Sequence, residues 1–169
     1  MNGEEGFGTI DAMIEATLCF LLDGSPPARI LLGLKKRGFG EGKLNGLGGK
    51  VKHHETPLRT ILREVKEECG LTISADTLRP MGTIDFFFPF RRAFDHHVHV
   101  FLADAWEGEL SETEEMAPAW FPIDQIPFDA MWADDAHWLP LVLAGRRIEA
   151  EFTFAEDNKT IVGFAVRES

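Results

Sequence analysis

The sequence predicts an α/β domain in which helices cover the faces of a mixed β-sheet. Short apolar or alternating segments, typical of strands, outnumber the helical segments. Two segments have helical character, and a sheet with helices on its faces is the simplest way to bury both kinds of element. The chain has 169 residues, enough for one sizeable core, so we expect one domain over residues 1–169.

The N-terminal half begins with two strand segments and a glycine-rich loop. Residues 16–22 are apolar and bulky and stop at a turn sequence, residues 23–27. Residues 29–34 resume as a second strand, so the two should form a hairpin. Residues 36–50 then contain six glycines and predict a loop.

The clearest helix of the chain follows this loop. Thr56 is a good N-cap, Pro57 suits the first helical position, and Gly70 can supply the left-handed stop. One helix face is apolar, with side chains at i, i+3, i+4 and i+7: Leu58, Ile61, Leu62 and Val65.

The C-terminal half contains most of the remaining strands. Residues 127–145 predict a second helical region that begins with tryptophan. We expect strands at residues 81–90, 97–105, 118–122, 151–154 and 160–166, the last two joined as a hairpin.

The charge balance excludes several classes of partner. The chain has 17 Lys and Arg against 28 Asp and Glu, a net charge of −11, which disfavours binding to nucleic acid or to an anionic membrane. Residues 1–15 carry no Lys or Arg, and the apolar run 16–22 is too short to span a bilayer. Two cysteines form no disulfide framework or metal motif. We therefore expect a cytoplasmic protein with two buried, reduced thiols.

Three glutamates gather on the polar face of the helix. Glu67 and Glu68 lie within about 60° of Glu64 around the axis. Like charges at i, i+4 cost a few tenths of a kcal/mol, so a compensating cation is expected. Mg²⁺ binds carboxylates together with substrate phosphates, and the preceding glycine-rich loop, with Lys50, offers backbone N–H groups to phosphates. This context favours a metal site over a solvated acidic face.

The residues from Gly49 to Leu71 resemble a complete Nudix box. Gly49 is followed after five residues by Glu55 and after seven more by Arg63-Glu64-Val65-Lys66-Glu67-Glu68-Cys69-Gly70-Leu71. The resemblance implies an α/β/α sandwich around a mixed sheet, and hydrolysis of a nucleoside diphosphate linked to another group with Mg²⁺ or Mn²⁺. It implies that Glu64, Glu67, Glu68 and the Gly48 carbonyl hold the metal. It also implies that Arg63 locks in place a glutamate of the unit formed by the glycine-rich loop and the helix that follows it, here called the loop–helix unit.

A second motif lies in residues 131–138. Asp134 and Asp135 stand between Trp132 and Trp138. A tryptophan face can stack on a purine while carboxyl groups hydrogen-bond its polar edge, which would make a nucleobase slot. The alternative is a helix start with both tryptophans in the core.

The resemblance extends over about residues 17–167. It is closer to the MutT-type members of the family that act on oxidised purine nucleoside triphosphates. It implies that four residues read the base: Asn45, Trp132, Asp134 and Asp135. It implies that others line the cleft: Thr17, Lys35, Phe39, Phe86, Phe88 and Trp138. Further expected substrate contacts are Leu47, Gly48, Gly49, Lys50 and Ala133. Glu115 would add an acidic group near the metal, although residues 112–115 could equally be a solvated loop.

The tract 87–97 departs from the pattern of these MutT-type members. It is one residue longer, and His96 stands where they carry methionine at the pocket wall. On an alternating strand His97 and His99 share a face and His96 does not, which favours pocket and surface roles over a metal site.

The predicted reaction converts damaged purine nucleoside triphosphates, such as 8-oxo-dGTP and 2-hydroxy-dATP, to monophosphate and pyrophosphate. A Nudix enzyme for ADP-ribose, dinucleoside polyphosphates, or undamaged or methylated dNTPs is one alternative. A non-catalytic nucleotide sensor is another, which the intact glutamates disfavour. We expect a small-molecule purine nucleoside triphosphate as partner, no nucleic acid or membrane, and a monomer.

Overall fold

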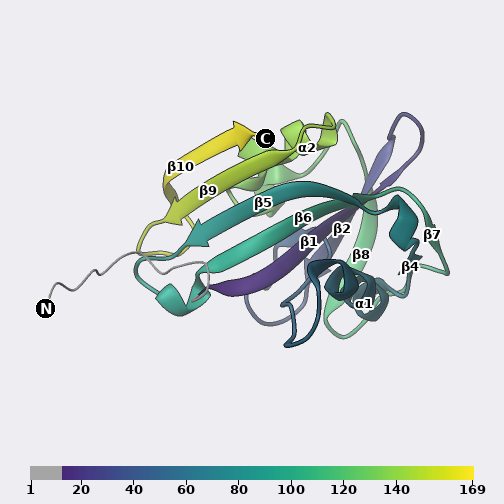
Figure 1. Ribbon diagram of the computed structural model, residues 1–169, viewed down its shortest axis with the longest axis horizontal. Helices are drawn as coiled ribbons and strands as arrows, with labels where there is room; N and C mark the ends of the chain where they lie inside the picture. Colours follow the sequence, from purple (N-terminus) through teal and green to yellow (C-terminus); the bar gives the residue numbers. More distant parts are fainter. Residues whose placement is uncertain (1–12) are drawn as a thin grey trace, which may run out of the picture.

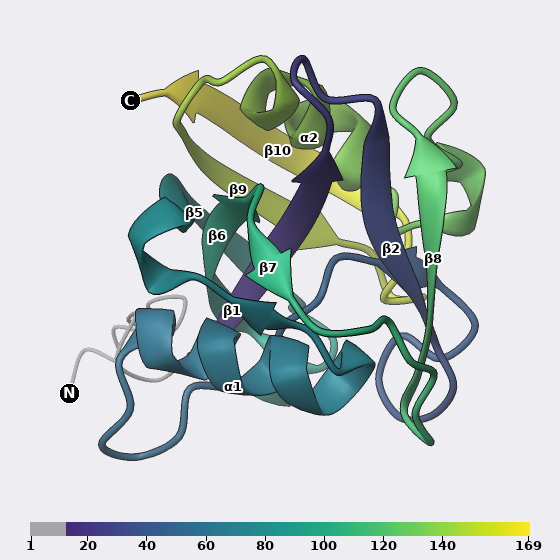
Figure 2. The same ribbon diagram turned by 90° about the vertical axis from the view of Figure 1, so that its right-hand side faces the viewer.

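The computed structural model describes residues 13–169 and arranges them in three layers. A mixed sheet forms the middle layer, helix α1 covers one of its faces and helix α2 covers the other (Figures 1 and 2). The helices are α1 (Pro57–Cys69) and α2 (Asp135–Leu143), with short 3₁₀ turns η2 (Ala75–Thr77), η3 (Arg92–Phe94) and η4 (Phe128–Ala130). The strands are β1 (Ile14–Asp23), β2 (Arg29–Lys35), β3 (Leu44–Asn45), β4 (Thr72–Ile73), β5 (Arg79–Phe87), β6 (His96–Ala103), β7 (Trp106–Glu107), β8 (Met116–Pro122), β9 (Ile148–Phe154) and β10 (Ile161–Glu168).

The sheet is mixed, as predicted. Within residues 13–169 it has eight strands in the order β10-β9-β5-β6-β1-β2-β3, and β8 pairs with β2 off this path. The pairs β1–β6 and β5–β9 are parallel and the others are antiparallel. β4 and β7 form a separate two-stranded pair.

Strand β1 runs through the centre of the molecule and is buried on both faces. Cys19 and Leu21 belong to the core on the α1 side, whereas Leu18 and Phe20 belong to the core on the α2 side. A strand covered on both faces needs no polar alternation, which explains the continuous apolar run in the sequence.

The predicted hairpin of β1 and β2 is confirmed only beside its turn. The strands pair at Leu22↔Ile30 and Asp23↔Arg29 and then separate. Residues 47–50 lie beside the rest of β1 in place of β2, with isolated antiparallel bridges such as Cys19↔Leu47. This loop is thereby held by a central strand, which later positions the glutamates of α1.

Helix α1 has the predicted ends. The Thr56 side chain accepts a hydrogen bond from the Arg59 N–H, and Gly70 adopts the left-handed conformation with φ of 83°. The predicted apolar face is partly wrong, because Leu58 is exposed and Glu68 is buried. The buried face is turned toward Glu68, since that side chain is hydrogen-bonded to the loop beside β1.

The remaining predicted strands are present with ends shifted by a few residues, including the C-terminal hairpin β9–β10. The predicted helical region 127–145 divides into η4 and α2. The two-residue strands β3, β4 and β7 were not predicted, because their pairing depends on segments distant in sequence.

Cys19 and Cys69 are buried and free, as predicted. No helix between residues 13 and 169 is long and apolar enough to cross a bilayer.

Candidate active site

The glycine loop and helix α1 meet through one backbone contact. The Gly48 N–H donates a 2.8 Å hydrogen bond to Oε1 of Glu68. A Cβ atom on Gly48 would lie 2.0 Å from the carbonyl oxygen of Thr17, so this close approach requires glycine. The Thr17 hydroxyl and N–H both bond to the Gly49 carbonyl, at 3.1 and 2.9 Å. The loop is therefore held rigidly between β1 and α1.

Arg63 organises the glutamates of the loop–helix unit. Its Nε and Nη2 donate to the two oxygens of Glu55 at 2.7 and 2.8 Å. Its Nη1 donates to Glu64 at 2.8 Å and to Glu67 at 3.2 Å. The two hydrogen bonds from Arg63 lower the pKa of Glu55 to about 2. Glu55 is thus the glutamate that Arg63 holds in place.

The carboxylates of α1 are electrostatically unfavourable by themselves. Burial raises the pKa of Glu68 to about 8, although the Gly48 N–H opposes this, and the charges of Glu64 and Glu115 raise it further. Burial likewise raises the pKa of Glu64, with contributions from Glu67 and Glu115. Glu115, far away in sequence, is therefore close enough to interact with two of the predicted metal ligands.

This donor set fits a hard divalent cation. Carboxylate oxygens are the ligands that Mg²⁺ prefers, and a cation would relieve the repulsion that raises the pKa values of Glu64 and Glu68. Between residues 13 and 169 no three His, Cys, Asp or Glu side chains converge as a ready cation site. Arg63 binds Glu64 and Glu67, and the Gly48 N–H binds Glu68.

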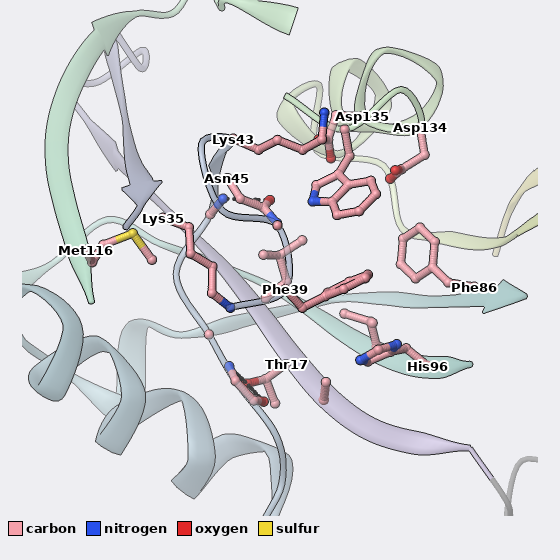
Figure 3. Close-up of a pocket in the computed structure, with 18 of the residues that line it drawn as sticks. Thr17, Lys35, Phe39, Lys43, Asn45, Phe86, His96, Met116, Asp134 and Asp135 are labelled. Atoms are coloured by element: carbon pink, nitrogen blue, oxygen red, sulfur yellow. Dashed lines mark hydrogen bonds between the residues drawn. The ribbon is translucent and has the colours of Figure 1, made fainter. Parts of the chain in front are cut away.

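A pocket lies beside this unit and reaches the N-terminus of α2 (Figure 3). Predicted site residues make up much of its wall: Thr17, Lys35, Phe39, Asn45, Gly48, Gly49, Glu68, Phe86, Phe88, Trp132, Asp134 and Asp135. Others were not predicted to line it, among them Leu18, Lys43, Met116 and Phe154. His96, which the sequence already suggested for the wall, also lines it. Lys43 lies within the glycine-rich loop, and only that position could have indicated it from the sequence.

Several predicted residues lie elsewhere. Trp138 is completely buried and does not line the pocket, because its indole packs on Phe20 in the core with ring centroids 5.9 Å apart. Leu47 is also completely buried, in the core under α1. Ala133 and Lys50 are exposed outside the pocket wall. The predicted metal ligands outside the wall are Glu64, Glu67 and Glu115, and Glu115 shares a shallow neighbouring depression with Lys35 and Arg37.

The pair Asp134 and Asp135 closes one end of the pocket, and both side chains are buried. The Trp138 Nε1–H donates a 2.8 Å hydrogen bond to Oδ2 of Asp134, which fixes that carboxylate. Burial raises the pKa of Asp134 to about 6. Burial and the neighbouring charge of Asp134 raise the pKa of Asp135 well above its usual value, and Oδ2 of Asp135 has no hydrogen-bond partner within residues 13–169. Two adjacent buried carboxyl groups cannot both ionise cheaply, so this arrangement favours one proton shared by the pair.

Aromatic rings form the walls between this pair and the glycine loop. Phe39 stacks on Trp132 with ring centroids 5.1 Å apart and an interplanar angle of 29°. The Lys43 ammonium lies 5.2 Å from the Trp132 ring centroid, a cation–π contact that holds this ring. The pocket thus combines flat apolar surfaces with a polar end, as a planar heterocycle requires.

The three histidines of β6 separate as predicted. His97 bonds to Asp85 and His99 bonds to Glu15 on one face of the strand. His96 instead lines the pocket. The triplet is therefore not one cluster.

The fold and the loop–helix unit are those of a class of nucleotide hydrolases. Comparison with known sequences identifies the same class. The model of the NUDIX domain matches residues 14–142, and the chain belongs to the Nudix hydrolases, whose members generally depend on a divalent metal ion. The predicted family and fold are thereby confirmed.

Individual relatives indicate a more specific similarity within this family. The chain is 52% identical over 129 residues to the oxidized purine nucleoside triphosphate hydrolase of Danio rerio, covering 76% of this chain and 80% of that protein. It is 46% identical over 143 residues to the protein of the same name from Mus musculus, covering 84% of this chain and 88% of that protein. A crystal structure of a MutT protein from Bacillus halodurans shares the fold, with a TM-score of 0.78 and 24% identity over 91% of this chain and 97% of that chain.

Proposed function

We propose that this protein hydrolyses oxidised purine nucleoside triphosphates, such as 8-oxo-dGTP and 2-hydroxy-dATP, to the monophosphate and pyrophosphate. One observation carries the proposal: a single pocket joins the buried Asp134–Asp135 pair to Gly48, Gly49 and Glu68. A nucleotide has a planar polar base at one end and phosphates at the other, which matches this arrangement. The names of the Danio rerio and Mus musculus relatives support the same substrate class.

The base end is suited to a purine. The flat ring of Trp132 lines the pocket, and the Asn45 amide nitrogen can donate a hydrogen bond while its oxygen accepts one from the Gly46 N–H. When one carboxyl group of the pair is protonated it can donate a hydrogen bond, while the other, ionised, accepts one. Because the proton can move between the two carboxyl groups, the pair can match donor–acceptor patterns of more than one purine.

The phosphate end is suited to a metal-bound polyphosphate. We propose that Glu64, Glu67 and Glu68, with the Gly48 carbonyl and Glu115, hold Mg²⁺ or Mn²⁺. Such an ion neutralises phosphate charge and lowers the pKa of a bound water. Lys35 lines the pocket near Glu68 and can pair with a phosphate oxygen. Attack of water within the α–β linkage forms one P–O bond, breaks the bridging P–O bond and releases pyrophosphate.

The proposal includes the setting in which the enzyme acts. We propose that residues 1–169 form one domain that works as a monomer in the cytoplasm on a small-molecule substrate. The net charge of −11 disfavours nucleic acid and anionic membranes as partners. The buried free thiols Cys19 and Cys69 are consistent with a reducing compartment.

The test is a comparison of kcat/KM for 8-oxo-dGTP, 2-hydroxy-dATP, O6-methyl-dGTP, dGTP and ADP-ribose, with products identified by ³¹P NMR. We expect the two oxidised purines to be preferred over dGTP and ADP-ribose, with pyrophosphate as product. Preference for ADP-ribose would support another Nudix activity. Binding of all five nucleotides without turnover in Mg²⁺ or Mn²⁺ would support a sensor instead. Orthophosphate as the first product would contradict the proposed site of attack.

A further inference from the structure

His96 lies on the pocket wall away from the Asp134–Asp135 pair. Figure 3 shows the aspartates at one end of the pocket and His96 toward the other, with Phe86 on the side between them. His96 is the first residue of β6, and its ring stacks on Phe39 with centroids 5.8 Å apart and an interplanar angle of 15°. The imidazole is therefore a fixed polar group in an otherwise aromatic part of the wall.

The contacts of His96 define its tautomer. Nδ1 is hydrogen-bonded to the carbonyl oxygen of Phe94, which can only accept, so Nδ1 carries the hydrogen. In the neutral ring Nε2 then has a lone pair. Nε2 makes no hydrogen bond to any residue from 13 to 169, and it is not among the fully buried unpartnered atoms. The imidazole of this pocket-lining residue thus carries an unused hydrogen-bond acceptor.

The surroundings keep this imidazole neutral at pH 7. Burial lowers the pKa of His96, and the positive charges of Lys50 and Lys35 lower it further. The bond to the Phe94 carbonyl and the charge of Asp95 act in the opposite direction without outweighing burial. Nε2 is therefore an acceptor under ordinary conditions.

An acceptor at this place distinguishes two kinds of purine. A purine oxidised at C8 carries a hydrogen on N7, whereas an undamaged purine has a bare lone pair there, and so does 2-hydroxyadenine. When the aspartate pair binds the pyrimidine-ring edge of a purine, the N7 edge points toward another part of the wall. We propose that Nε2 of His96 accepts a hydrogen bond from N7–H of 8-oxopurine nucleotides and thereby selects them against purines with a bare N7.

This inference rests on the proposed function, because it assigns one edge of the proposed substrate. It adds a specificity-determining residue that acts separately from the aspartate pair. A group that hydrogen-bonds the correct ligand rejects a ligand lacking the partner more strongly than an apolar wall does. The aspartates would then accept several purines, and His96 would favour those oxidised at C8.

The test compares His96→Met, which removes the acceptor, with His96→Gln, whose amide oxygen restores one. Binding of 8-oxo-dGMP and dGMP to the metal-free protein is measured by calorimetry, which does not depend on turnover. We expect His96→Met to reduce the preference for 8-oxo-dGMP over dGMP roughly tenfold, the usual effect of one hydrogen bond in a buried site. His96→Gln should keep most of the preference. His99→Met, on the other face of β6 and bonded to Glu15, is the matched control and should change neither affinity.

Turnover gives a second measurement. For His96→Met we expect kcat/KM to fall for 8-oxo-dGTP but not for 2-hydroxy-dATP, since only the former has N7–H. Equal changes for both substrates, or an unchanged preference in binding, would overturn the role of His96 while leaving the proposed function intact. A wild-type protein that neither binds 8-oxo-dGMP nor hydrolyses 8-oxo-dGTP would overturn both. Far-UV circular dichroism of His96→Met and His96→Gln separates either result from a loss of folding.

Discussion

The backbone N–H of Gly48 donates a 2.8 Å hydrogen bond to Oε1 of Glu68. This contact joins a loop that runs beside β1 to the last turn of α1. It turns the helix so that Glu68 is buried while Leu58, part of the predicted apolar face, is exposed. The loop backbone at Gly48 thus positions the proposed metal ligands together with the helix that carries them.

Gly49→Ala tests how closely the loop and helix fit. A Cβ atom on Gly49 would lie 2.5 Å from Cδ of Glu64, so the carboxylate must move. We expect turnover to fall by on the order of tenfold or more, because misplacement of a charged group at a reacting centre is costly. Gly163→Ala is the matched control, since nothing lies within 4 Å of its added Cβ. Unchanged kcat/KM in Gly49→Ala would show that the position of Glu64 is unimportant.

Glu67→Gln tests the proposed metal site. The substitution keeps the shape but removes one negative charge, and we expect hydrolysis to fall on the order of 10²-fold or more. Folding should survive, because the Glu67 side chain is 54% exposed and exposed ion pairs such as its pair with Arg63 contribute little. Turnover and the thermal midpoint are measured with and without Mg²⁺. Glu114→Gln, in the exposed acidic loop, serves as control, and near-normal turnover in Glu67→Gln would rule out the assigned role.

Asp134→Asn and Asp135→Asn test base recognition. Asparagine has a fixed donor and a fixed acceptor, so it cannot exchange a proton as a carboxyl pair does. We expect each variant to change the ratio of kcat/KM for 8-oxo-dGTP and 2-hydroxy-dATP by roughly tenfold or more. Asp129→Asn, exposed in η4, controls for a change of surface charge. Equal losses on both substrates would mean that the pair serves packing or general electrostatics.

The protonation of the pair also predicts a pH dependence of stability. Because burial raises the folded-state pKa of Asp135, the folded protein binds more protons than the unfolded chain above about pH 4. The contribution of this carboxyl to stability is therefore present at low pH and is lost as the pH rises through its folded-state value. Asn mimics the protonated form, so Asp135→Asn should gain stability relative to the wild type as the pH rises.

The measurement for this prediction is the free energy of unfolding in urea at pH 5 and pH 8, without metal. The difference between Asp135→Asn and the wild type should favour the variant more at pH 8. A difference independent of pH would show that Asp135 is not protonated in the folded protein. Asp129→Asn again supplies the comparison for an exposed carboxylate.

The features that the sequence predicted well are local ones. The ends of α1 follow from Thr56, Pro57 and Gly70, because capping involves groups within one or two turns of each other. The common face of Glu64, Glu67 and Glu68 follows from helix geometry alone. The strands were predicted because alternating or continuous apolar side chains have few other ways to be buried.

The sequence by itself determined the ends of α1, the common face of its three glutamates, and whether most other segments are helix or strand. These features depend on residues that are close together along the chain. The tertiary structure decided which of the two tryptophans near the aspartate pair lines the pocket and which belongs to the core. Trp132 reaches the pocket whereas Trp138 is buried behind Asp134, although both stand in one short motif. It also decided that β1 pairs along its length with β6 and only at its end with β2. These outcomes depend on contacts between segments far apart along the chain, whose energies no local pattern of side chains encodes.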